Sequence, residues 1–284
     1  MKILKQIIAE IKNTKDEDTH QLQGLILRYI CYAPKMPLRI FQENLLERAE
    51  KNKLKVYDEY FSGQDLTFQA FKWGKGTRKI LLTHGWGSKA ADLYEIIMAL
   101  EQIENVEVIA FDAPGNGASE GELSSLLLFV EGVKAIVAQY GIPEVTIGHS
   151  LGATANIMAL EQLKIHPKQI ISIAPLIDLG KNFEASMDAI DIHKSIQHTF
   201  FENFEERFKK PVSKYNLVDW SAFTTDASKH WVAYDENDLV SPRSYINAFL
   251  NSNPAIGSIN YIGAGHERII KSSAMIENVI KIIG

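Results

Sequence analysis

Apolar and polar residues follow two different patterns along the chain. Up to residue 53 the apolar positions recur at helical spacing, and Pro34 and Pro37 divide this region into two predicted helices. Leu54–Phe61 and Leu66–Trp73 instead alternate apolar and polar residues, and Ser62–Asp65 lies between them. This alternation predicts an antiparallel hairpin with one solvated face.

From residue 79 onwards, short continuous apolar runs alternate with helical stretches. We expect these runs to be strands buried on both faces of a sheet: Lys79–His84, Val106–Asp112, Glu144–His149 and Gln169–Ala174. Helices are expected between them, over Ala90–Gln102, Leu123–Tyr140 and Leu151–Leu163. Alternation of this kind predicts right-handed crossovers and an α/β fold with a mostly parallel, twisted sheet and helices on both faces.

The alternation stops over residues 177–223, where the sequence is polar, aromatic and helical. It resumes with strands at His230–Asp235 and Ala255–Ile262, a helix from about Pro242 and a terminal helix from Glu267. The sequence therefore predicts a helical extension (1–53), a first core segment (54–176), a helical insertion above the sheet (177–223) and a second core segment (224–284).

Composition limits the classes of function that need to be considered. The 284 residues are 46% apolar and 23% charged, as in ordinary globular proteins that bury a sizeable core. A net charge of −5 without a dense Lys/Arg cluster argues against a nucleic-acid-binding protein. The single cysteine, Cys31, cannot form an intramolecular disulfide or a Cys-based metal site, and we expect it to be a small buried residue.

No targeting or membrane-spanning segment is expected from the sequence. No run of 18 apolar residues occurs, so no integral membrane segment is expected. Lys5, Glu10 and Lys12 interrupt any apolar run that could serve as the core of a signal peptide, and a cytoplasmic protein is the expectation.

The strongest chemical signal is GHSLG, from Gly148 to Gly152. It follows a predicted strand and opens a predicted helix, which is the context that a nucleophile elbow requires. Such a sharp turn exposes the hydroxyl of Ser150 at the positive end of the helix. We therefore predict that Ser150 is a nucleophile and that the N–H of Leu151 donates to the oxyanion that forms on attack.

A second motif, HGWG from His84 to Gly87, follows the strand that begins at Lys79. An acyl-transfer site needs two N–H donors, and we assign the second donor to the backbone of Trp86. A third Gly-rich segment, DAPGNGAS from Asp112 to Ser119, is interpreted as a structural turn, in which Asp112 braces the loop.

Candidates for the base and the acid lie near the C-terminus. His266 follows the last predicted strand in a Gly-rich loop, GAGHERII, from which an imidazole can reach the serine. Asp238 follows the strand His230–Asp235 and is the expected partner of the imidazole, because a carboxylate fixes the tautomer of a catalytic histidine. Asp235 is the nearest alternative acid, and Asp178 is a more distant one. His149 adjoins Ser150 but is expected to point away from it and to be packed.

Together these motifs resemble the α/β-hydrolase superfamily, in order and over roughly residues 54–176 and 226–284, and most closely its esterase-like bacterial members with HGWG and GHERII motifs. The resemblance implies an α/β-hydrolase fold, a Ser150–Asp238–His266 triad, an oxyanion hole at Trp86 and Leu151, and no metal or organic cofactor. It departs from the family at Asp235, where many members have glycine. It also implies that the insertion is a cap over the site.

The insertion contains four phenylalanines at near-helical spacing. We expect most of this stripe to pack the cap onto the core. Alternatively, Phe200, Phe201 and Phe204 line a substrate pocket together with Trp86.

The predicted function is hydrolysis of a small or medium apolar carboxylic ester. A C–C bond hydrolase or thioesterase with the same triad, and a non-catalytic binding protein of the same fold, remain alternatives. The natural ester, the oligomeric state and the role of the N-terminal helices stay open.

Overall fold

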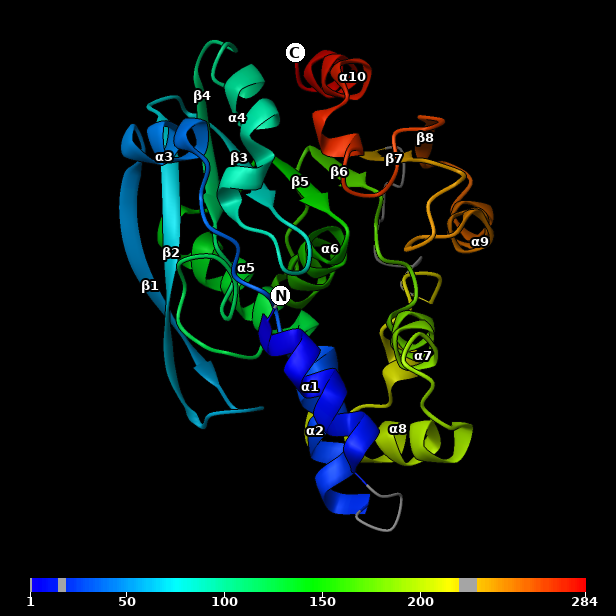
Figure 1. Cartoon of the computed structure of the whole chain (residues 1–284). Coiled ribbons are helices and arrows are strands. Elements are labelled where there is room, and N and C mark those ends of the chain that lie inside the picture. Colours follow the sequence, from blue (N-terminus) through cyan, green and yellow to red (C-terminus); the bar gives the residue numbers. More distant parts are fainter. Residues whose placement is uncertain (1, 15–18, 220–228) are drawn as a thin grey trace.

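The computed structural model describes residues 2–14, 19–219 and 229–284 (Figure 1). An eight-stranded sheet lies at its centre, with the strand order β1-β2-β4-β3-β5-β6-β7-β8. The strands are β1 (Glu50–Asp58), β2 (Gln64–Gly74), β3 (Arg78–Thr83), β4 (Val106–Phe111), β5 (Val145–His149), β6 (Gln169–Ile173), β7 (His230–Tyr234) and β8 (Gly257–Asn260). β1 pairs antiparallel with β2 and β2 antiparallel with β4, whereas all other neighbours are parallel. The predicted hairpin and the mostly parallel sheet are thus confirmed.

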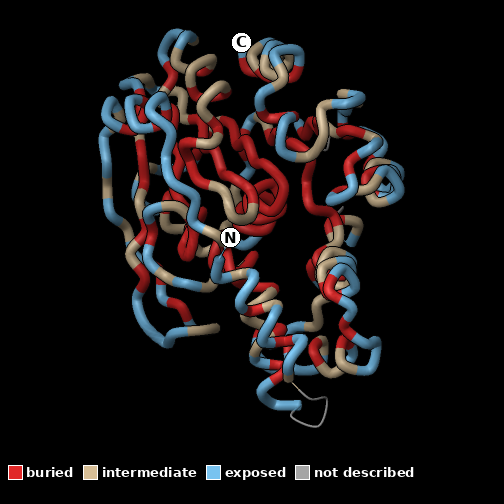
Figure 2. The backbone as a smooth tube through the Cα atoms, viewed as in Figure 1, coloured by how far each residue is buried: buried red, intermediate tan, exposed pale blue. Residues whose placement is uncertain are grey.

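Helices cover both faces of the sheet. Successive side chains of a strand point to opposite faces, and the central strands carry apolar residues on both, so both faces have to be covered. Ile80 and Leu82 of β3 pack into the core beneath α4 (Tyr94–Leu100) and α10 (Ser273–Ile283). Leu81, between them, packs into the opposite core, beneath α5 (Leu126–Tyr140) and α6 (Leu151–Leu163). α9 (Arg243–Ser252) packs against α6 at the far end of the sheet. Figure 2 shows the central strands buried and the edge strand β1 largely exposed.

The N-terminal region contains three helices rather than the predicted two. α1 (Lys2–Asn13) and α2 (Thr19–Cys31) precede Pro34, and α3 (Ile40–Glu47) follows Pro37. The two prolines lie in the loop between α2 and α3, as expected. Apolar residues alone did not reveal the break between α1 and α2, because both helices present their apolar faces to the same core.

The insertion between β6 and β7 contains α7 (Leu179–Asp188), α8 (Lys194–Phe208) and a 3₁₀ turn at Val212–Lys214. Figure 1 shows α7 and α8 beside α1 and α2, at the end of the molecule away from α4 and α10. The last residues of the predicted insertion (220–223) and the first of the second core segment (224–228) lie outside the described residues.

The terminal helix begins at Ser273 rather than at Glu267, because the Ser272 side chain accepts the N–H of Met275 and caps it there. A 3₁₀ turn at Ile269–Lys271 precedes it. No helix among the described residues is long and apolar enough to cross a membrane. Within those same residues, His, Cys, Asp and Glu side chains form no cluster that could hold a metal ion.

Candidate active site

The turn between β5 and α6 holds Ser150 in a strained conformation. Its φ is 52° and its ψ is −122°, a left-handed combination that non-glycine residues rarely adopt. The backbone N–H of Ser150 donates to the Ile173 carbonyl (2.9 Å), and its carbonyl accepts the N–H of Leu176 (3.3 Å). The hydroxyl therefore stands at the N-terminus of α6, which is the placement that GHSLG predicts.

The two glycines of this motif are required by close approach of the backbone. A Cβ atom at Gly152 would lie 2.3 Å from the His84 carbonyl oxygen, and one at Gly148 would lie 2.4 Å from the Cα of Ala153. Any side chain at either position would push the start of α6 away from the sheet. Gly85, in the HGWG loop, is similarly close to the turn, since its Cβ would lie 3.1 Å from the Cβ of Ser150.

The structure brings Ser150, His266 and Asp238 together in one chain of hydrogen bonds. His266 Nε2 lies 2.9 Å from Ser150 Oγ, and His266 Nδ1 lies 2.6 Å from Asp238 Oδ2. Because the carboxylate accepts the Nδ1 proton, Nε2 is left free to accept the proton of the serine hydroxyl. The three groups come from the ends of β5, β7 and β8 and so meet at the carboxyl edge of the sheet.

Asp238 is held as a charged acceptor. Its Oδ1 accepts the backbone N–H groups of Val240 (2.7 Å) and Ser241 (3.1 Å), so both of its oxygens are engaged. Burial opposes ionisation of this carboxyl, but the hydrogen bond and the charge of His266, together with the two N–H groups, lower its pKa below the ordinary value. The lowered pKa favours the ionised form of Asp238.

The rival acids occupy different positions. Asp235 is buried and accepts the N–H of Gly265 (2.7 Å) and of Asn237 (3.0 Å), so that it ties the loop of His266 to the end of β7. Asp178 caps α7 by accepting the N–H of Lys181, and its other oxygen accepts the side chain of Asn216. The geometry thus gives Asp238 the contact with His266 and leaves Asp235 a positioning role.

Trp86 and Leu151, which carry the two predicted N–H donors, line one cavity together with Ser150. Among the residues that the structure describes, the backbone N–H groups of Trp86 and Leu151 have no hydrogen-bond acceptor. Asn116 fixes the loop of Trp86 by accepting the N–H of Gly87 (3.1 Å) and donating to the Pro114 carbonyl (3.1 Å). Two free donors on a braced loop and a helix N-terminus can stabilise a developing oxyanion.

Two buried groups next to the site have structural roles. His84 donates from Nδ1 to the Gly85 carbonyl and accepts the N–H of Ala113 at Nε2, and burial lowers its pKa to about 4. Asp112 accepts the N–H groups of Ala90 and Ala118, both at 2.8 Å, and so braces its loop as predicted. Burial raises the pKa of Asp112 to about 6.

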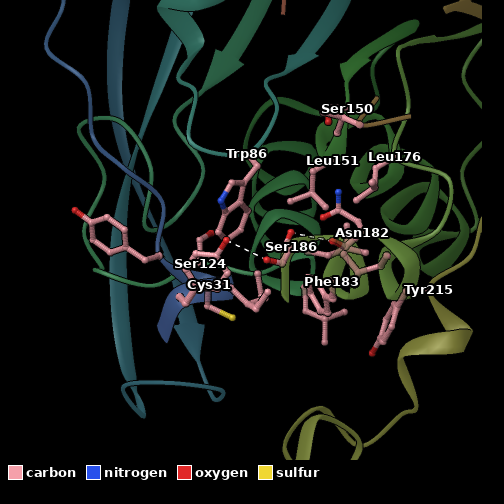
Figure 3. Close-up of a pocket in the computed structure, with 18 of the residues that line it drawn as sticks. Cys31, Trp86, Ser124, Ser150, Leu151, Leu176, Asn182, Phe183, Ser186 and Tyr215 are labelled. Atoms are coloured by element: carbon pink, nitrogen blue, oxygen red, sulfur yellow. Dashed lines mark hydrogen bonds between the residues drawn. The ribbon is translucent and has the colours of Figure 1, made fainter. Parts of the chain in front are cut away.

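A cavity of about 400 Å³ opens beside the serine and the histidine, and its lining is mainly apolar. In Figure 3, Trp86, Leu151 and Leu176 lie between Ser150 and the opposite end, where Cys31 and Ser124 are found. Of the four predicted pocket residues, Trp86 and Phe204 line the cavity. Phe200 and Phe201 do not, which corrects that expectation. Phe200 is buried between Phe183 and Phe204, and the ring of Phe201 contacts it edge-on.

Comparison with known proteins identifies the family. Residues 80–268, more than half of the chain, match the model of the alpha/beta hydrolase family. The chain belongs to the alpha/beta hydrolase family. Monoglyceride lipase of Rattus norvegicus is 34% identical over 112 residues, which cover 36% of this chain and 37% of that protein. The match thus spans little more than a third of that relative's length.

Solved structures share the fold of this alpha/beta hydrolase at low sequence identity. An esterase of Pyrococcus furiosus has a TM-score of 0.62 and 19% identity, covering 89% of this chain and 97% of its own. A thioesterase domain from the curacin biosynthetic pathway has a TM-score of 0.58 and 14% identity, with coverage of 83% and 99%. An esterase of Thermogutta terrifontis has a TM-score of 0.58 and 14% identity, with coverage of 82% and 98%.

Sequence reasoning missed several residues that shape the site of this alpha/beta hydrolase. His149 is buried, as expected, but its Nε2 lies 3.0 Å from the backbone carbonyl of His266 and so helps to hold that loop. Asn116 was hidden in a loop interpreted only through its proline and glycines. Residues between Leu4 and Pro34 also line the cavity. Their helical spacing showed an apolar face but gave no indication of what that face covers.

Proposed function

We propose that this protein is a serine hydrolase that cleaves a small or medium apolar carboxylic ester through an acyl-enzyme intermediate. Membership of the alpha/beta hydrolase family supports hydrolysis in general. The observation that carries the specific proposal is the chain Ser150–His266–Asp238, which ends at an apolar cavity. The matched segment of monoglyceride lipase is consistent with an ester substrate that carries an acyl chain.

The first half of the reaction forms the acyl-enzyme. Ser150 Oγ attacks the ester carbonyl while His266 Nε2 takes its proton, and Asp238 stabilises the resulting imidazolium. The carbonyl oxygen becomes an oxyanion that the N–H groups of Trp86 and Leu151 can bind. When the tetrahedral intermediate collapses, the C–O bond to the alcohol breaks and His266 returns the proton to the departing alcohol.

The second half releases the acid. Water gives a proton to His266 and attacks the acyl carbonyl, and a second oxyanion forms in the same place. Collapse then breaks the bond to Ser150 Oγ, which recovers its proton from His266. The transfers between Ser150 Oγ and His266 Nε2 follow a hydrogen bond of 2.9 Å that supports this sequence of steps.

Labelling with a fluorophosphonate probe tests the proposal directly. The intact protein should gain the mass of one adduct, whereas Ser150→Ala should gain none and should lose p-nitrophenyl ester hydrolysis by about 10⁴-fold or more. Both proteins should give the same circular dichroism spectrum and melting temperature within error. A wild-type protein that takes no adduct and hydrolyses no ester would refute the proposal and favour a binding protein of this fold.

A further inference from the structure

One wall of the cavity comes from outside the segment that matches the family model. That match begins at residue 80, yet α2 and the loop after it contribute Tyr29, Cys31 and Pro34 to the lining. Cys31 is only 2% exposed and lies, in Figure 3, at the end of the cavity away from Ser150. The end of α2 and the loop after it therefore form part of the cavity wall.

Hydrogen bonds hold this wall in place from two sides. The backbone N–H of Ser124 donates to the Cys31 carbonyl (2.8 Å), which joins the end of α2 to the segment before α5. On the other side, the Tyr29 hydroxyl donates to the Ser186 carbonyl of α7 (3.2 Å), and Gln23 Nε2 donates to the Ile196 carbonyl of α8 (3.0 Å). A wall tied in this way resists displacement by a long substrate.

At the closed end, beside Cys31, the hydroxyl groups of Ser124 and Tyr29 are already engaged, whereas the hydroxyl of Tyr215, elsewhere in the lining, has no partner among the described residues. The Ser124 hydroxyl donates to the Pro114 carbonyl (2.6 Å) and accepts from Asn116, and it is fully buried. The Tyr29 hydroxyl is engaged with Ser186. Burial raises the pKa of Cys31 to about 12, so its thiol is neutral at pH 7. An apolar group fits this end, whereas a polar group would lose its water without replacement.

The order of the chemical steps decides which part of the ester occupies the closed end. The alcohol leaves after the first step and has to be replaced by water, so it belongs at the open side, where Val240 and Glu267 are exposed. The acyl group stays bound to Ser150 until the last step and can lie in the closed part.

Building on the proposed function, we propose that the cavity holds the acyl chain, with its carbonyl at Ser150 and its methyl end against Cys31, so that helix α2 sets the longest acyl chain that the enzyme accepts. The substrate class is then an ester of an unbranched aliphatic acid. The alcohol part is left largely unselected, because it lies at the open side.

Substitutions at Cys31 test this inference with two series of esters. One series lengthens the acyl chain of p-nitrophenyl esters, and the other lengthens the alcohol of acetate esters. For the longest acyl chain that wild type accepts, kcat/KM of Cys31→Phe should fall by about tenfold or more, the equivalent of about two methylenes that lose their burial. Acetyl esters should change by less than about threefold, since they do not reach α2. Cys31→Ala, the control, should retain or extend the long-chain limit.

Three outcomes would overturn the inference: an equal loss for all acyl lengths, no change for any length, or a loss confined to long alcohols. Cys31→Leu adds less volume and replaces Cys31→Phe if the latter fails to fold. Labelling with a fluorophosphonate that carries a short alkyl group distinguishes a failure of this inference from a failure of the proposed function. If it labels wild type and both variants, Ser150 is activated and an unchanged length profile counts against the role of α2 alone. If it fails to label wild type, the proposed function itself is wrong.

Discussion

The two aspartates after β7 differ in which atoms are already engaged, and this decides what an asparagine would do at each position. At Asp238, Oδ1 is occupied by the N–H groups of Val240 and Ser241. The oxygen of Asp238→Asn would keep that place and turn its NH₂ group toward His266. The imidazole would then carry its proton on Nε2 and could not accept the proton of Ser150.

We therefore expect Asp238→Asn to lower kcat by about 10³–10⁴-fold. At Asp235 both oxygens accept backbone N–H groups, and an amide can satisfy only one of them. Asp235→Asn should lower the free energy of unfolding by about 1–3 kcal/mol and reduce kcat by only about tenfold. Ester hydrolysis and urea unfolding of both variants measure this contrast. The opposite ranking in kcat would assign the acid to Asp235.

At the scale of the elements, the position of α6 depends on contact between its first turn and the end of β3, where the HGWG loop begins. A methyl group at Gly152 would lie 2.3 Å from the His84 carbonyl oxygen and 2.5 Å from that of Thr83. Both of these are backbone atoms, so the clash cannot be relieved by a side-chain rotation.

Gly152→Ala should therefore lower the free energy of unfolding by about 2–5 kcal/mol and remove most of the activity. Gly24, in α2, provides the matched control, because it is exposed and a Cβ there meets nothing within 4 Å. Gly24→Ala should raise the free energy of unfolding by about 0.5–1 kcal/mol. Thermal melting of both variants tests the argument, which a stable, active Gly152→Ala protein would contradict.

The sequence best predicted the strands that are buried on both faces, because such burial requires a continuous run of apolar residues. β3, β4, β5 and β6 are buried on both faces, and their continuous apolar runs located them almost to the residue. The terminal helix was misplaced because Glu267 and Arg268 look helical locally, whereas the Ser272 cap decides the start. The sequence left open which aromatic residues of α8 pack against neighbouring helices and which line the cavity. Helical spacing gives the apolar face of α8, but it does not reveal that α2 and α7 pack against that helix.

For the whole molecule, burial of titratable groups makes stability depend on pH. Burial lowers the pKa of His84 to about 4, of His149 to about 3 and of His230 to about 4. Below about pH 6.5 the unfolded chain binds protons at these imidazoles while the folded protein does not, so acid favours unfolding. Asp112 acts in the opposite direction, because its pKa is raised to about 6 in the fold, and it offsets one of the three histidines.

The free energy of unfolding should therefore decrease as the pH falls from about 6.5 to about 4.5, by at most about 3 kcal/mol per pH unit. Urea unfolding at a series of pH values measures the slope. The ring of His230 has the Ser172 hydroxyl as its one hydrogen-bond partner among the described residues. His230→Gln should therefore reduce the slope by about 1.4 kcal/mol per pH unit, which is the contribution of one proton. A free energy of unfolding that stays constant or increases as the pH falls over this range would show that these imidazoles are protonated in the folded protein.

The hydrogen bonds that join α2 to α7 and α8 also affect how the chain is made. Gln23 and its partner Ile196 are 173 residues apart. On a ribosome that adds about 5–20 residues per second, the apolar face of α2 emerges roughly 10–35 s before the helix that covers it. Throughout that interval the nascent chain displays Leu22, Ile26 and Ile30, all buried in the finished protein, to whatever surrounds it. Synthesis of this hydrolase thus includes a prolonged stage in which a holding chaperone has a defined surface to bind.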